Sequence, residues 1–178
     1  DLRQLQEGDQ LSRLLEKLCR QREMLDREAG KKTPLLIKLA PDWEGEALQQ
    51  SIARIKTFPL DGVVATNTTL SREGLTSPLA RESGGLSGKP LLKSSNKVIK
   101  TLYREIGTQI PIIGVGGIFN AEDAYAKIKA GASAVQVYTG LIYQGPGMVR
   151  ELKKGLVRLL RQDGLPNISA AIGLDEKT

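Results

Sequence analysis

The chain has 178 residues, of which 40% are hydrophobic and 26% are charged, and its formal net charge is +6. This composition predicts a chain that buries a core and excludes an intrinsically disordered one. With no histidine and one cysteine, Cys19, the sequence excludes an internal disulfide, the usual zinc sites and histidine-based catalytic triads. Aromatic residues make up only 4%, which disfavours a stacking platform for nucleic acid, and the scattered Lys and Arg side chains favour solvated helix faces over a polyanion site. No apolar run approaches the ~20 residues that a membrane span requires.

Alternating helices and strands are predicted along the whole chain. Leucines at helical spacing predict a first helix over 9–28, in which Cys19 is a buried structural thiol. A short apolar run at 35–39, bounded by Pro34 and Pro41, is typical of a strand buried on both faces. Further helices are predicted near 44–56, 94–106, 121–130 and 147–162, and further strands at 62–66, 111–115 and 134–138. The tail at 164–178 shows little periodicity, and we expect it to pack over the end of the barrel or to fray.

Four strands, each followed by a helix, predict a parallel βα array. Such an array is half of a (β/α)8 TIM barrel, and the alternative is an open doubly wound sheet. Dinucleotide-binding sheets of the second type carry GxGxxG after their first strand, and this motif is absent. Glycines instead follow the last two strands, at Gly116, Gly117 and Gly140, where barrels commonly bind phosphate. The glycine placement therefore favours the barrel.

The two glycine-bearing turns predict a phosphate cradle. Backbone N–H groups at Gly116 and Gly117 can approach a ligand closely, and Thr139 with Gly140 ends the neighbouring strand. Each turn alone is equally well explained by a tight connection that needs glycine, but their pairing favours phosphate. The polar loop at 71–90, which contains Gly88, is much longer than the usual connection of about 4–6 residues and indicates a functional loop or lid.

Polar side chains also occur at or near the ends of the first two of the four strands. Lys38 lies in a strand otherwise made of Leu and Ile, so it is expected to point into the barrel or toward its mouth and to need an anionic partner, such as the pyrimidine edge of a flavin. A lysine that snorkels to solvent is the alternative. The run at 66–69, Thr-Asn-Thr-Thr, can bind amide and carboxylate groups, although turns also favour these residues.

Several segments resemble the dihydroorotate dehydrogenase family, in the family's order and over nearly the whole chain. They are Ile37-Lys38-Leu39-Ala40-Pro41-Asp42, Thr66-Asn67-Thr68-Thr69, Gly84-Gly85-Leu86-Ser87-Gly88-Lys89-Pro90, Ile112-Ile113-Gly114-Val115-Gly116-Gly117-Ile118 and the stretch from Gly131 to Gly140. The glycine-rich loop and the Tyr138-Thr139 strand end resemble the quinone-reducing, membrane-associated class in particular.

The resemblance implies an FMN enzyme that oxidises dihydroorotate to orotate with a quinone as acceptor, in de novo pyrimidine biosynthesis. It implies that Asn67 and Thr68 bind the substrate and that Gly117 and Thr139 serve the FMN phosphate. The implied FMN contacts as a whole are Lys38, Thr66, Ser87, Gly88, Gly116, Gly117, Tyr138 and Thr139. No metal is implied.

The resemblance also implies that residues 1–178 are the carboxyl-terminal half of one FMN-binding barrel domain, about its last four βα units. In this class a serine base precedes a Leu-Arg-x-Leu-Gln stretch, which residues 2–6 match, so no catalytic residue is expected in this chain. The base, the early strands and the membrane-docking helices are expected in an absent amino-terminal half. A peripheral location follows, on the cytoplasmic face of a bacterial inner membrane or, in a eukaryote, on the mitochondrial inner membrane.

Two other functions stay open at this point. One is an incomplete barrel fragment that binds phosphate or flavin without turnover. The other is a phosphate-binding barrel enzyme that acts on a sugar or a nucleotide.

Overall fold

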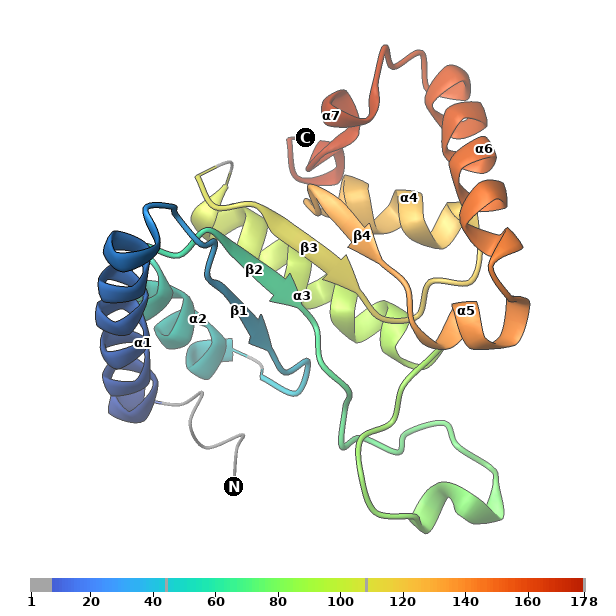
Figure 1. Ribbon diagram of the computed structural model, residues 1–178. Coiled ribbons are helices and arrows are strands. Elements are labelled where there is room, and N and C mark those ends of the chain that lie inside the picture. Colours follow the sequence, from blue (N-terminus) through green and yellow to red (C-terminus); the bar gives the residue numbers. More distant parts are fainter. Residues whose placement is uncertain (1–7, 44, 108, 178) are drawn as a thin grey trace.

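The computed structural model describes residues 8–43, 45–107 and 109–177. Within these residues, one sheet contains the parallel strands β1 (Leu36–Leu39), β2 (Gly62–Ala65), β3 (Ile112–Val115) and β4 (Ala134–Gln136). The strands lie side by side in their order along the chain (Figure 1). Doubly wound sheets reverse their strand order at a switch point, whereas a barrel runs in sequence. The four strands therefore have the order of half a barrel.

Five helices lie where they were predicted, with small changes at their ends, and two short helices, at 139–144 and 168–171, were not predicted. The helices are α1 (Gly8–Ala29), α2 (Gly45–Ile55), α3 (Leu91–Ile106), α4 (Ala121–Lys129), α5 (Thr139–Gln144), α6 (Gly147–Gln162) and α7 (Ile168–Ala171). Helix α3 begins three residues before its predicted start, directly after Pro90, because proline lacks the N–H that a first turn leaves unbonded. Strand β4 ends two residues before its predicted end, and α5 begins at Thr139. Among the residues that the structure describes, no helix is both long and apolar enough to cross a membrane.

The tail does not fray, and it packs on the outer helices rather than over the end of the barrel. Helix α7 and the 3-10 turn η3 (Leu174–Glu176) lie against α4, where the Gly173 N–H donates to the Ile128 carbonyl at 3.1 Å. The Glu176 side chain, only 3% exposed, forms an ion pair with Lys100 of α3 at 3.1 Å. These elements are too short to show a helical period, so the sequence pattern gave no sign of them.

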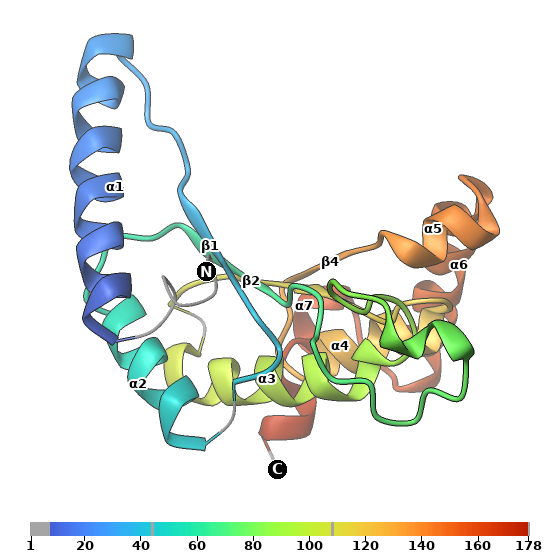
Figure 2. The ribbon, with the colours of Figure 1, turned by 90° about the horizontal axis from the view of Figure 1, so that it is seen from below.

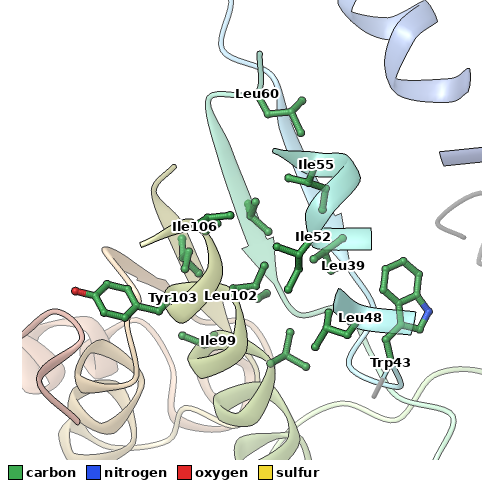
Figure 3. Close-up of a cluster of buried hydrophobic side chains, with 14 of the residues drawn as sticks. Leu39, Trp43, Leu48, Ile52, Ile55, Leu60, Ile99, Leu102, Tyr103 and Ile106 are labelled. Atoms are coloured by element: carbon green, nitrogen blue, oxygen red, sulfur yellow. The ribbon is translucent and has the colours of Figure 1, made fainter. Parts of the chain in front are cut away.

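The core lies between the sheet and the helices. Helices α2, α3 and α4 cover the same face of the sheet (Figure 2). Fully buried Leu39 packs from this face in one cluster with Ile52 of α2 and with Ile99 and Leu102 of α3 (Figure 3). Val63 of β2 is also fully buried and belongs to the same cluster. Cys19 is buried in the same cluster, as predicted for a structural thiol.

The opposite face of the sheet is open over the described residues. We call it the open face; strand register places Leu36, Lys38, Ala134 and Gln136 on it, and all four are exposed. The prediction that the strand at 35–39 is buried on both faces is therefore wrong for the described structure, since Leu36 is 39% exposed. In a closed barrel, strands from the other side of the barrel cover this face, and such strands are not among β1–β4.

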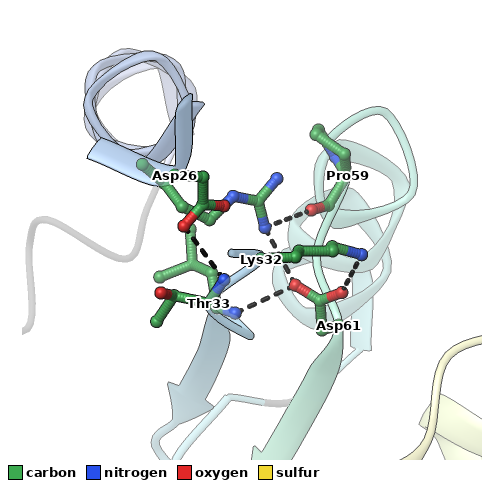
Figure 4. A network of polar contacts seen from close by, with 7 residues as sticks. Asp26, Lys32, Thr33, Pro59 and Asp61 are labelled. Atoms are coloured by element: carbon green, nitrogen blue, oxygen red, sulfur yellow. Dashed lines mark hydrogen bonds and ion pairs between the residues drawn. The ribbon is translucent and has the colours of Figure 1, made fainter. Parts of the chain in front are cut away.

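A polar network joins α1 to the beginnings of β1 and β2 (Figure 4). The Asp61 carboxylate accepts hydrogen bonds from Arg22 of α1 at 2.8 Å, from Lys32 at 2.6 Å and from the Leu35 N–H at 2.9 Å. Arg22 also donates to the Pro59 carbonyl at 3.0 Å. The hydrogen bond from Lys32 and that from the Leu35 N–H hold the pKa of Asp61 below its usual value. The network fixes α1 against the strand ends far from the glycine turns.

Candidate cofactor and substrate site

A cavity of about 200 Å³ lies at the carboxyl ends of the strands, where barrel active sites are found. It brings together all the site residues predicted from the sequence, which are Lys38, Thr66, Asn67, Thr68, Ser87, Gly88, Gly116, Gly117, Tyr138 and Thr139. Its volume is below the range of about 300–1,000 Å³ that is typical of small-molecule sites. The cavity therefore has the position of a barrel active site but only part of the expected enclosure.

Other lining residues were not singled out from the sequence. They are Leu91, Val115, Ile118, Gln136 and Val137. Gln136 carried a usable signal, because it is a polar residue inside a strand otherwise made of Ala and Val. The rest are apolar, and their periodicity alone cannot distinguish a cavity wall from a core.

Lys38 lies on the open face and lines the cavity. Register aligns it with Val64 of β2, Ile113 of β3 and Ala134 of β4, so its neighbours across the sheet are apolar. Its exposed side chain agrees with the predicted place at the barrel mouth. The structure thus gives the lysine access to a ligand, while its part in binding one stays a prediction.

Thr66 and Asn67 are held in place by their own backbone. The Thr66 N–H donates to the Val115 carbonyl at 3.0 Å, and the Asn67 N–H donates to the Leu39 carbonyl at 2.7 Å. The Thr66 side chain is buried, and its Oγ1 has no hydrogen-bond partner among the described residues. A buried hydroxyl without a partner costs about 1–3 kcal/mol, so this atom fits a ligand that would bond to it.

The turn at Gly116 and Gly117 requires glycine for a packing reason that the sequence did not show. Both residues have positive φ angles, +114° and +76°. A Cβ atom at Gly117 would lie 2.6 Å from backbone atoms of Leu92, at the beginning of α3. The helix behind the turn is therefore sufficient by itself to exclude a side chain there. The turn still lines the cavity, as a phosphate cradle requires.

The long loop at 71–90 is ordered by its own hydrogen bonds. Thr69 and Leu86 exchange two backbone bonds, of 3.1 and 2.8 Å, which close the loop at its base. Inside it, the Arg72 guanidinium donates to the carbonyls of Ala80, Glu82 and Gly84, at 2.6–3.2 Å.

The loop reaches the cavity at Ser87 and Gly88. Thr139 Oγ1 donates to Ser87 Oγ at 3.0 Å and so links the loop to the beginning of α5, which follows β4. The predicted functional loop is thus part of the cavity wall.

Comparisons with known proteins agree with this arrangement. The dihydroorotate dehydrogenase family model matches residues 1–160. The dihydroorotate dehydrogenase (quinone) of Trichodesmium erythraeum is 48% identical over 184 residues, covering 99% of this chain and 47% of that protein. The protein of the same name from Anaeromyxobacter sp. strain Fw109-5 is 51% identical over 178 residues, covering 99% of this chain and 48% of that protein.

Solved structures give the same result. The DHODH of Eimeria tenella in complex with ferulenol superposes with a TM-score of 0.92 at 39% identity, covering 99% of this chain and 51% of that one. The chain thus spans about half the length of the curated relatives that it matches. The predicted match at residues 2–6 lies outside the described residues. From the family model, the identities and the superposition together, the chain belongs to the dihydroorotate dehydrogenase family.

Proposed function

We propose that this chain forms the FMN-binding, carboxyl-terminal half of a quinone-dependent dihydroorotate dehydrogenase, which oxidises dihydroorotate to orotate in pyrimidine biosynthesis. The observation that carries the proposal is the meeting of ten predicted site residues in one cavity at the carboxyl ends of the strands. The name shared by the relatives at 48% and 51% identity supports the choice of substrate and acceptor.

The phosphate of FMN would be held by the turn at Gly116 and Gly117 together with Thr139. The glycine turn directly follows β3, and Thr139 begins the helix that follows β4, the neighbouring strand in the sheet. Tyr138, which precedes Thr139 in the chain, and Ser87, which is bonded to Thr139, line the same cavity. Gly88 lets the loop pass close to Thr139, since a Cβ atom there would lie 3.2 Å from Thr139 Cγ2.

The isoalloxazine ring would lie along the open face, between Lys38 and the cradle. There the ammonium group of Lys38 would stabilise negative charge at the pyrimidine edge, and the unpartnered hydroxyl of Thr66 would bond to the ring. When bound, FMN would accept a hydride from dihydroorotate and pass the electrons to a quinone. Asn67 and Thr68 would orient the substrate through its amide and carboxylate groups.

A companion half would complete the site. The exposed side chains of the open face and the small volume of the cavity support a further set of strands that covers this face. That half would supply the serine base and the helices that contact the membrane. The protein would then be peripheral on the cytoplasmic face of a bacterial inner membrane, or on the mitochondrial inner membrane of a eukaryote.

The test is a visible absorbance spectrum of the full-length protein, recorded before and after anaerobic addition of dihydroorotate. We expect a bound flavin whose absorbance bleaches with dihydroorotate and returns with a quinone analogue. A bound flavin that dihydroorotate does not bleach would support a flavin-binding barrel without turnover. Failure to bind FMN at all would favour a phosphate-binding barrel enzyme for a sugar or a nucleotide.

A further inference from the structure

Lys127 is a fully buried lysine on the helix side of the sheet, outside the cavity. It belongs to α4, and its ammonium group donates to Ser95 Oγ at 2.9 Å and to Asn96 Oδ1 at 2.8 Å, both on α3. Its aliphatic stem passes directly behind β3, because a Cβ atom at Gly114 would lie 2.8 Å from Lys127 Cδ. Gly114 therefore makes room for a lysine that joins the two helices behind the strand.

The same hydrogen bonds continue to the glycine turn. Ser95 Oγ donates to the carbonyl of Val115 at 2.7 Å, and the Thr66 N–H donates to the same oxygen at 3.0 Å. Val115 is the last residue of β3 and directly precedes Gly116. A Cβ atom at Gly116 would lie 3.4 Å from Ser95 Cβ, so Ser95 also lies against the turn itself. One continuous path thus joins the Lys127 ammonium group to the predicted phosphate cradle.

A buried ammonium group at this place needs a physical reason. Both acceptors of Lys127 are neutral side chains, and burial lowers the pKa of the lysine from 10.5 to about 7, although the charge of Asp123 opposes the shift. Methionine would fill a similar volume without burying a charge. Stability of the fold alone therefore does not account for a lysine.

We propose that Lys127 is a positioning residue for the cofactor phosphate: through Ser95 it holds the turn at Gly116 and Gly117, and it places a buried positive charge behind that turn. This inference rests on the proposed function, because it assumes that the turn receives the phosphate of FMN. A phosphate group at the turn would favour the charged form of Lys127, and the charged form would in return favour the phosphate. Riboflavin, which lacks the phosphate, would gain nothing from this charge.

The test compares the affinities of the full-length apoprotein for FMN and for riboflavin, measured by fluorescence titration. In Lys127→Met we expect FMN affinity to fall by about tenfold or more, while riboflavin affinity changes by less than about threefold. Ser95→Ala interrupts the path while the lysine itself stays in place, and it should lower FMN affinity in the same selective way. Lys129→Met is the matched control, because Lys129 lies on the same helix but forms an ion pair with Asp175 of the tail at 3.8 Å.

The pH dependence gives a readout that a merely structural lysine would not move. The groups facing Lys127 are Asp123 on its own helix, neutral Ser95 and Asn96 on α3, and Gly114 on β3. In the wild type, the preference for FMN over riboflavin should decline as the pH rises above about 7, where the free lysine loses its proton. In Lys127→Met the preference should be flat over that range, and the phosphate's own titration near about pH 6 is common to both proteins.

Three outcomes separate this inference from the function on which it rests. Equal weakening of FMN and riboflavin in Lys127→Met would overturn it, because the lysine would then only support the fold. Unchanged FMN affinity in both Lys127→Met and Ser95→Ala would overturn it as well, and if Lys127→Met does not fold, Ser95→Ala decides alone. A wild-type protein that binds riboflavin and FMN equally would instead refute the phosphate cradle of the proposed function.

Discussion

Replacing Gly117 with alanine separates two reasons for a glycine at the end of β3. Gly117 and Gly74 have the same φ angle, +76°, but only Gly117 has neighbours where a Cβ atom would be placed. In Gly74→Ala the change adds only the strain of an alanine in left-handed backbone, about 1–2 kcal/mol. In Gly117→Ala the new Cβ atom would also lie 2.6 Å from backbone atoms of Leu92.

Relief of that overlap requires movement of the turn or of helix α3. Carbon atoms in contact are separated by about 3.5–4.0 Å, so the two segments must move apart by about 1 Å. Overpacking of this kind costs about 1–3 kcal/mol. We therefore expect Gly117→Ala to lower the free energy of unfolding by about 2–5 kcal/mol in urea titrations, against about 1–2 kcal/mol for Gly74→Ala. FMN affinity should fall only in Gly117→Ala, because the turn that moves is part of the cavity wall.

Equal destabilisation by the two substitutions would refute the contact between the turn and α3. A Gly117→Ala protein that keeps its stability but loses FMN would show that the phosphate, and not the helix, requires the glycine. That result would restore the reason predicted from the sequence.

Three further substitutions test other parts of the site and fold. Lys38→Met should slow anaerobic flavin reduction by at least about tenfold with little change in stability, since Lys38 is exposed, and unchanged stopped-flow kinetics would contradict its role. Thr66→Val should leave the apoprotein as stable or more stable but weaken FMN binding, because Thr66 Oγ1 has no described partner. Thr69→Val is its control and should destabilise the protein, since Thr69 Oγ1 bonds to Asp42. Asp61→Asn should cost about 1–2 kcal/mol at neutral pH. Because the folded pKa of Asp61 is lowered, that difference should be constant above about pH 4 and should disappear as the pH falls through the folded pKa. Urea titrations in which the difference is already lost at a pH well above about 4 would contradict the network.

The sequence by itself determined the order of the four strands and their main helices, and it identified the polar residues and glycines that line the cavity. Short apolar runs separated by helical periods specify a parallel array, and in such a sheet all strands end at the same edge. Polar residues and glycines that lie near the carboxyl end of a strand or shortly after it, such as Lys38, Thr66, Gly117 and Thr139, must therefore lie near one another. Their convergence depends only on local pattern and on this topological rule.

Only the tertiary structure decided what lies behind the site. The reason for glycine at position 117 depends on Leu92, and the bond from Lys127 to Ser95 joins residues 32 positions apart on different helices. The burial of one face of β1 and the docking of the tail on α3 and α4 depend in the same way on distant partners. Periodicity reports which residues of a segment share a face, but it carries no information on which segment packs against that face. Contacts between helices therefore had to come from the folded arrangement.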